Sequence, residues 1–416
     1  MNTILFATGI ENSYPTVQGG KRRDLAAETG HYKRWREDLQ LCKEIGAHVV
    51  RYGPPYYIVH GGPHSYDWSY VDDELAYIRE LGLIPIVDLC HFGVPDWVGS
   101  FQNGDWPQLF ADFADAFAAR YPWVVYYTPV NEILVCARFS GKEGIWNEQL
   151  KSDKAMIAAH KHMCKATLLS IERILRHRSD AVFFQSETTE AFFAHSPEMQ
   201  AEADFHNELR FLTFDFLYGH PPNGDALMFL MKNGATPQDY QWFMEHGRKA
   251  APHCVMGMDY YAMNERALHP DGSQEAIGPV LGWNNIARGY YERYRRPMML
   301  TETNALDPQE APGWLWKTWH NVLALRKEGV PVVGFTWYSL IDQVDWDIQL
   351  REIRGKVNGN GLFTLERQPQ PVATAFRDLV RHYGDLPVLE DFPIGNMRGP
   401  LSERWLADAV ETKRAP

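Results

Sequence analysis

Short apolar runs alternate with longer amphipathic stretches along most of the chain, and this alternation limits the fold more than any other feature of the sequence. Runs with the character of buried strands occupy residues 3–8, 47–52, 84–90, 124–130, 181–186, 254–260, 298–301 and 332–338. Apolar residues recur at helical spacing in residues 31–45, 69–81, 106–120, 153–178, 311–328 and 370–382. Eight strands separated by helices predict an α/β protein, a single (β/α)8 TIM barrel with its active site at the C-terminal ends of the strands.

The predicted barrel spans residues 1–390. A chain of 416 residues, of which 45% are hydrophobic and 13% aromatic, is able to build the large core that such a barrel needs. The intervals 187–253 and 261–297 are longer than one helix and its loops require, so we expect extra helices and loops over the active face. Residues 391–416 are rich in proline and charge, and they predict a C-terminal surface extension.

The formal net charge of −12 argues against nucleic acid or an anionic membrane as a partner. There is no run of about 18 apolar residues that would predict a membrane-spanning helix. The first residues lack the basic segment of a signal peptide and favour a first strand instead. Five scattered cysteines without CxxC spacing are typical of reduced core residues. We therefore expect a cytoplasmic protein, and a homo-oligomer is left open.

Two segments, TPVNE at 128–132 and LTETN at 300–304, each place a glutamate directly after a predicted strand. In a barrel, Glu132 and Glu302 would meet at the same end. A retaining glycosidase needs such a pair, one as general acid and base and the other as nucleophile. Either glutamate alone would also fit an ordinary strand-end carboxylate facing water, but the pair and its polar neighbours favour the catalytic interpretation.

Other strand ends carry side chains suited to assist this pair. Arg51 would keep Glu302 ionised, although a structural ion pair at the barrel is the alternative. Tyr261 would position the same carboxylate, or else pack in the core. Asn131 would donate to a sugar hydroxyl beside the reacting carbon, or else act as a turn residue after its strand.

Two further residues are candidates for sugar contacts. His91 would hydrogen-bond a sugar hydroxyl, although a satisfied core histidine is the simpler interpretation of that residue alone. Flat apolar faces stack on the C–H surfaces of sugars, and Trp346 after the eighth strand is well placed for this. The expected partner is therefore a small-molecule glycoside.

Metal and nucleotide sites find little support. The sequence contains no HExxH motif and no glycine-rich phosphate-binding motif. The histidines are scattered, and His160 and His162 are expected to face solvent on their helix. We expect neither a metal nor a cofactor.

The chain resembles glycoside hydrolase family 1, the β-glucosidase-like enzymes of a large retaining (β/α)8 clan. The similarity begins at FATGIENSYP and continues through HYKRWREDLQLCKEIGAHVVRYG, HFGVPDW and TPVNE to GMDYY, LTETN, GFTWYSLIDQVDW and GNGLF. The resemblance implies Glu132 as acid/base and Glu302 as nucleophile, with Arg51 and Tyr261 as partners of the nucleophile. It also implies His91 and Asn131 as sugar ligands.

The sequence departs from the family pattern in the shell that would bind sugar hydroxyls. Pro15 replaces a family glutamine, and Glu11 or Asn12 would have to take over its contacts. Phe92 replaces a tryptophan and Asp259 an asparagine. Tyr338 aligns with the platform tryptophan of the family, unless Trp337 has taken its place, and Asp345 stands one methylene short of the family glutamate before Trp346.

These residues favour a retaining exo-β-glycosidase that acts on a small β-glycoside by double displacement. A transglycosidase or another activity of the clan would use the same two glutamates. A sugar-binding barrel without turnover stays open because the hydroxyl-binding shell is altered, although retention of both glutamates argues against it.

Overall fold

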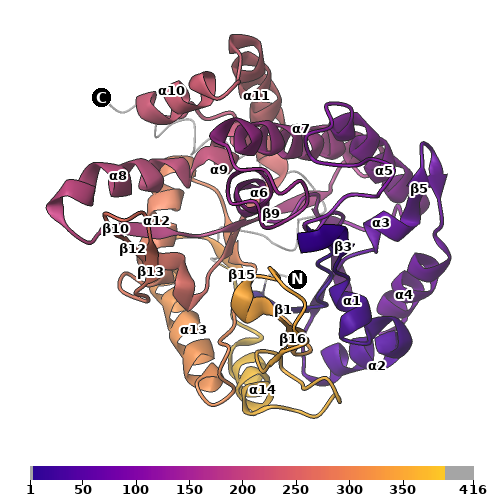
Figure 1. Cartoon of the computed structure of the whole chain (residues 1–416). Helices are drawn as coiled ribbons and strands as arrows, with labels where there is room; N and C mark the ends of the chain where they lie inside the picture. Colours follow the sequence, from indigo (N-terminus) through magenta and orange to yellow (C-terminus); the bar gives the residue numbers. More distant parts are fainter. Residues whose placement is uncertain (1–2, 389–416) are drawn as a thin grey trace.

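The computed structural model of the protein describes residues 3–388. Eight parallel strands close into a barrel at the centre of the molecule (Figure 1). The strands are β1 (Leu5–Gly9), β4 (Val49–Tyr52), β7 (Ile84–Asp88), β8 (Tyr126–Thr128), β9 (Val182–Thr188), β11 (Cys254–Asp259), β14 (Met298–Leu300) and β15 (Val332–Trp337). Each strand pairs with the next in this series, and β15 pairs with β1. All eight predicted strands and the barrel itself are confirmed. The predicted C-terminal extension at 391–416 lies outside the described residues.

The six helices predicted around the barrel are also present. They are α2 (His31–Glu44), α4 (Ser69–Glu80), α5 (Trp106–Arg120), α7 (Asp153–His177), α13 (Ala311–Lys327) and α14 (Pro371–Tyr383). Their local signals agree with their ends: the Ser152 side chain caps α7 by accepting from the Ala155 backbone, and proline begins α14. Within residues 3–388, no helix combines the length and the apolar character that crossing a bilayer requires.

The two long intervals hold extra elements, as expected. Residues 187–253 contain α8 (Gln200–Leu209), α9 (Leu212–Tyr218), α10 (Gly224–Lys232) and α11 (Pro237–Ala250). Residues 261–297 contain α12 (Trp283–Tyr294) together with β12 (Glu265–Leu268) and β13 (Gln274–Ala276). These two strands join β10 (Ala191–Ala194) in a small sheet that the sequence did not predict, packed against α8 beside the barrel (Figure 1).

Short elements complete the connections at the barrel ends. They are β2 (Thr16–Val17), β3 (Lys21–Arg22), α1 (Leu25–Glu28), α3 (Tyr56–Val59), β5 (His60–Gly62), β6 (Ser65–Tyr66), α6 (Ile133–Ala137), a π-helical turn at Arg138–Lys142, β16 (Gln343–Val344) and β17 (Val357–Asn358). Two of them matter for the site. Helix α6 begins directly after Glu132, and the β16–β17 hairpin holds the connection that follows β15.

Side chains alternate between the inside of the barrel and the layer between strands and helices. The inner set is Leu5, Ala7, Val49, Ile86, Val182, Phe184, Val255, Met299 and Val333, all buried. The outward-pointing neighbours, such as Phe6, Val50 and Val87, pack under the helices in one large core. This period of two follows from the strand geometry, in which successive side chains point to opposite faces.

The expectation that His160 faces solvent is wrong. The His160 side chain is fully buried, and its Nε2 lies 3.1 Å from the Thr213 hydroxyl of α9. Burial lowers the pKa of His160 to about 3. His162 is half-buried, with Nδ1 2.7 Å from the carbonyl oxygen of Phe101. Helix α7 packs against both α5 and the extra helix α9, so more than one of its faces is covered.

Shortening a side chain inside the barrel should destabilise the protein. For Ile86→Ala we expect the free energy of unfolding to fall by about 2–5 kcal/mol, because the rigid ring of strands cannot collapse around the cavity. Urea unfolding followed by circular dichroism measures the change. The matched control, Ile58→Ala at a residue that is 48% exposed, should change stability by no more than about 0.5 kcal/mol. Equal losses in both variants would contradict the packed interior.

Candidate active site

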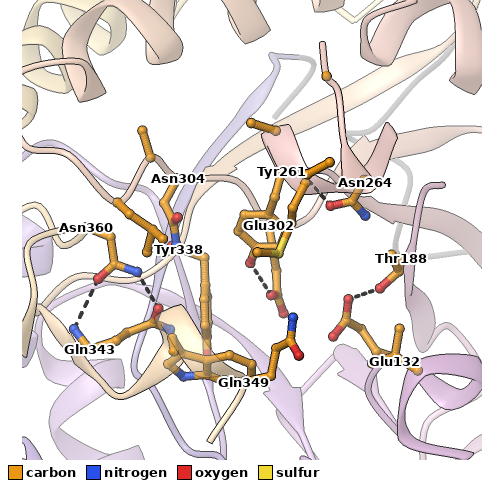
Figure 2. A pocket seen from close by; sticks show the side chains of 18 of the residues that line it. Glu132, Thr188, Tyr261, Asn264, Glu302, Asn304, Tyr338, Gln343, Gln349 and Asn360 are labelled. Carbon is orange, nitrogen blue, oxygen red and sulfur yellow. Dashed lines mark hydrogen bonds between the residues drawn. The ribbon is translucent and has the colours of Figure 1, made fainter. Parts of the chain in front are cut away.

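A cavity of about 630 Å³ opens at the C-terminal ends of the barrel strands. Six residues predicted for the site line it, namely His91, Glu132, Tyr261, Glu302, Tyr338 and Trp346. Figure 2 shows that the carboxyl groups of Glu132 and Glu302 both project into this cavity. A pocket of this size holds a small organic ligand rather than a macromolecule.

Glu302 follows β14 and is held by two side chains from other strands. The Tyr261 hydroxyl donates to Oε2 at 2.8 Å, and the Arg51 guanidinium donates to Oε1. Glu302 is only 3% exposed. A buried carboxylate needs such compensation, because its negative charge has lost most of its contact with water. The predicted contacts of Arg51 and Tyr261 with Glu302 are therefore present in the structure.

Arg51 also organises the polar groups beneath the cavity. Its Nη2 donates to Asp88 Oδ2 and to Asn131 Oδ1, each at 2.9 Å. The same Asp88 oxygen lies 2.7 Å from His91 Nδ1, and Asn131 Nδ2 lies 3.2 Å from His91 Nε2. The network joins residues on or just after the three neighbouring strands β4, β7 and β8, and Arg51 connects it to Glu302 after β14, so each side chain is held from more than one strand.

The charges of this network act on His91. Burial by itself lowers the pKa of the imidazole, but the adjacent Asp88 carboxylate together with the charges of Glu302 and Glu11 outweighs that effect, and the pKa of His91 lies above its ordinary value. The ring lies parallel to the Tyr338 ring, with centroids 6.2 Å apart. Asn131 is fully buried and lies behind His91 rather than in the cavity lining.

Glu132 has a different environment. It precedes α6 with a left-handed backbone, φ +40°, a conformation that costs a non-glycine residue free energy. The Thr188 hydroxyl donates to its Oε1 (Figure 2). Burial raises the pKa of Glu132 well above its ordinary value, and the negative charges of Asp259 and Glu302 raise it further. Glu132 thus keeps its proton to a higher pH than an ordinary glutamate.

A third carboxyl, that of Asp259, lies below the cavity lining. It accepts hydrogen bonds from the Ser186 hydroxyl at 2.7 Å and from the Thr301 hydroxyl at 2.6 Å. Burial, and then the charge of Glu302, raise the pKa of Asp259 well above its ordinary value. A protonated carboxyl can both donate and accept hydrogen bonds, as a side-chain amide can, so Asp259 can fill the place of the asparagine that the family resemblance led us to expect.

Trp337 and Asp345 are two of the four predicted sugar ligands that do not line the cavity. Trp337 is fully buried, and its Nε1 donates to the Asn360 carbonyl oxygen at 3.0 Å. Asp345 is also fully buried, and its carboxylate accepts from Arg23 at 3.2 Å and from three backbone amides of residues 354–356 at 2.8–3.0 Å. These contacts occupy both of its oxygens and turn the carboxylate away from the cavity.

Glu11 also lies behind the cavity lining. Its Oε1 accepts from the Ser13 backbone amide at 2.9 Å, and its Oε2 accepts from the Gln343 side-chain amide. Burial raises the pKa of Glu11. Gln343 does line the cavity, so Glu11 influences the cavity only through its hydrogen bond to Gln343.

Several polar residues of the cavity were missed by sequence reasoning. They are Thr188, Asn264, Asn304, Gln343, Gln349 and Asn360. Asn304, Gln343 and Asn360 do stand in the segments LTETN, GFTWYSLIDQVDW and GNGLF, so their positions carried a signal. Their side-chain directions depend on loop conformation, which these segments do not reveal. Among residues 3–388, no three His, Cys, Asp or Glu side chains gather in a way that would hold a metal ion.

Known proteins share both the sequence pattern and the architecture. The chain matches the model of glycosyl hydrolase family 1 over residues 10–222. It is 19% identical over 369 residues to a 1,4-β-D-glucan glucohydrolase of Thermotoga neapolitana, covering 79% of this chain and 85% of the relative. It is 22% identical over 383 residues to an aryl-phospho-β-D-glucosidase of Bacillus subtilis (strain 168), covering 76% and 77%.

Among solved structures, the family 1 β-glucosidase from Thermotoga maritima superposes with a TM-score of 0.76. The alignment covers 91% of this chain and 98% of that chain, at 16% sequence identity. At this identity the likeness establishes the fold.

The raised pKa of Glu132 predicts a pH-dependent gain in stability when its carboxyl is removed. Below the ordinary pKa of glutamate, native and unfolded chains are both protonated at this residue. At higher pH the unfolded chain loses the proton first, so the cost of the carboxyl to stability grows as the pH rises toward the native pKa and stays at its full size above it. Glu132→Gln should therefore raise Tm more at pH 7 than at pH 4.

Thermal unfolding of both proteins at the two pH values measures this difference. Glu80→Gln, on the exposed outer face of α4, is the matched control and should give no such difference. A gain for Glu132→Gln that is the same at pH 4 and pH 7 would contradict the environment described for Glu132.

Proposed function

The chain belongs to glycosyl hydrolase family 1, and from this premise we propose that it is a retaining exo-β-glycosidase acting on a small β-glycoside by double displacement. Membership of the predicted family is confirmed, and with it a glycoside hydrolase activity. The observation that carries the finer proposal is that two buried carboxyls share one cavity in opposite environments. Glu302 is paired with a guanidinium, whereas Glu132 is buried among acids that raise its pKa.

In the first step, Glu302 attacks the anomeric carbon and Glu132 gives its proton to the departing glycosidic oxygen. The bond from carbon to the aglycone oxygen breaks as the bond to the Glu302 carboxylate forms. Arg51 and Tyr261 support this role, because they hold the carboxylate in one orientation and the guanidinium balances its charge. The result is a covalent glycosyl-enzyme and a free, neutral aglycone.

In the second step, Glu132 has become a carboxylate and takes a proton from water. The water oxygen attacks the same carbon, the bond to Glu302 breaks, and Glu132 regains its proton. Two inversions at one carbon give net retention of configuration. The Thr188 hydroxyl supports the cycle, since it can donate to Glu132 in its ionised form and so prevents an excessive rise of its pKa.

The cavity supports exo action on a small substrate. Its volume of about 630 Å³ fits one sugar ring with a modest aglycone, so a longer oligosaccharide would enter the cavity only with its terminal sugar. The name of the Thermotoga neapolitana relative, a glucan glucohydrolase, agrees with this mode for that protein. We propose that His91, Tyr338 and Trp346 contact the sugar.

Four of the other predicted residues act behind these contacts. Asn131 lies between Arg51 and His91 and orients both. Trp337 and Glu11 hold residues of the lining, and Asp345 fixes the loop at 354–356. We propose these four as positioning residues, since none of them lines the cavity.

Replacing the nucleophile should abolish hydrolysis in a way that small anions can repair. For Glu302→Gly we expect kcat on an active aryl β-glycoside to fall at least about a thousandfold, because no covalent intermediate can form. Added azide or formate fits the space left by the carboxylate and should restore turnover. Glu80→Gly on α4 is the control and should keep its activity. Near wild-type hydrolysis by Glu302→Gly would disprove the assignment of the nucleophile.

Replacing the acid should affect substrates according to their leaving groups. Glu132→Ala should lose about 10²–10⁴-fold in kcat/KM on a phenyl β-glycoside, whose leaving oxygen needs a proton. A 2,4-dinitrophenyl glycoside of the same sugar leaves without one, so its first step should be nearly unaffected. Wild-type activity should fall at high pH as Glu132 loses its proton, and the variant should lack that limb of the profile. Equal losses on both substrates would count against the assignment.

A further inference from the structure

Side-chain amides gather on one side of the cavity. Gln343 and Asn360 lie with Tyr338 and Asn304 on the side of Glu302 that faces away from Glu132 (Figure 2). Under the proposed function, Glu132 protonates the leaving oxygen, so the aglycone departs on the Glu132 side. We take the sugar ring that stays bound to Glu302 to extend toward the amides, which lie on the side of Glu302 away from the departing aglycone. This side is therefore the glycone end of the cavity.

The two amides at this end are held rigidly. The Gln343 side chain donates to Glu11 and accepts from the Asn360 side chain, and the Gln343 backbone amide donates to Asn360 Oδ1 at 3.1 Å. Trp337 fixes the Asn360 backbone through a hydrogen bond of 3.0 Å. The β16–β17 hairpin places Gln343 opposite Asn358. A lining fixed in this way binds hydroxyl groups without a further cost of ordering.

Each amide still has hydrogen-bonding capacity for a ligand. A side-chain amide can donate two hydrogen bonds and accept two. The contacts above use one donor and one acceptor site on each of Gln343 and Asn360. Both side chains are at least 95% buried and yet line the cavity. Sugar hydroxyls, which both donate and accept, match the remaining donor and acceptor of each amide.

The basic residues of the same connection are turned to other partners. Arg354 and Lys356 pair with Asp347, at 2.9 and 2.8 Å, and Arg351 lies 3.5 Å from Glu143. None of these three cations lines the cavity. The cations that do line it, Arg138, Arg266 and Lys317, belong to elements after β8, β11 and β14.

The Arg51 guanidinium and the His91 imidazole do lie near Tyr338 at the glycone end, but they are already paired with Glu302 and Asp88, so the amides are the groups that this end offers to a ligand. A phosphate or carboxylate buried among amides alone would lose hydration without gaining an opposite charge. We propose that this protein takes a neutral glycone, and that Gln343 and Asn360 determine which neutral sugar it accepts. The proposal rests on the proposed function and specifies its substrate class.

The first test compares sugars that share one aglycone. The probes are the 4-nitrophenyl β-glycosides of glucose, galactose, fucose, glucuronic acid and 6-phosphoglucose. We expect kcat/KM on the best neutral sugar to exceed that on either anionic sugar at least about 100-fold. Preference for an anionic probe, with activity still lost in Glu302→Gly, would overturn this inference and leave the proposed function intact. No hydrolysis of any probe would count against the proposed function itself and would remove the basis of this inference.

The second test asks whether the amide selects the sugar. Gln343→Ala should lower kcat/KM on the preferred sugar about 10–100-fold and change its ratio between glucoside and galactoside, because contacts to particular hydroxyls are lost. A purely structural role would lower both substrates equally and leave the ratio unchanged, which would overturn the role of Gln343. Gln108→Ala, an exposed glutamine on α5, is the matched control. If Gln343→Ala does not fold, Asn360→Ser tests the same ratio from the other amide.

Discussion

The buried ion pair between Arg51 and Glu302 is the interaction on which the rest of the site depends. A guanidinium that is 1% exposed must be compensated from several directions, and Asp88 and Asn131 supply the contacts that Glu302 leaves open. These partners stand on or just after different strands of the barrel. The closed ring of parallel strands therefore brings the charges together, and the charges in turn fix the orientation of the polar residues at its end.

The same ion pair separates the two carboxyls chemically. Glu302 has a cation and a hydroxyl beside it, whereas Glu132 has a threonine hydroxyl, a helix start and other acids. Desolvation acts on both, but only Glu302 has a buried cation to offset it. The left-handed backbone of Glu132 and its buried acid both cost stability, which is typical of residues that serve a reaction rather than the fold.

The connection after β15 decides what the cavity presents to a ligand. Asp345 is drawn to Arg23, which is 322 positions away in the sequence, and to the amides of residues 354–356. Gln343 and Asn360 therefore face the cavity in its place, and they are held there by Glu11 and Trp337. Asp345, which stands where the family has a glutamate, thus supports the loop at 354–356, and the side-chain amides of Gln343 and Asn360 line the cavity instead.

Periodicity along the chain was sufficient to predict the eight strands, the surrounding helices and the meeting of Glu132 and Glu302, because strand alternation and barrel closure depend on local pattern and on element order. The burial of His160 could not be predicted, since α9 covers it from a long interval whose packing has no local signature. The directions of Asp345 and Gln343 likewise depend on partners far away in sequence, Arg23 and Glu11. The sequence by itself determined the barrel and the meeting of Glu132 and Glu302 at one end of it, and only the tertiary structure decided which side chains line the cavity.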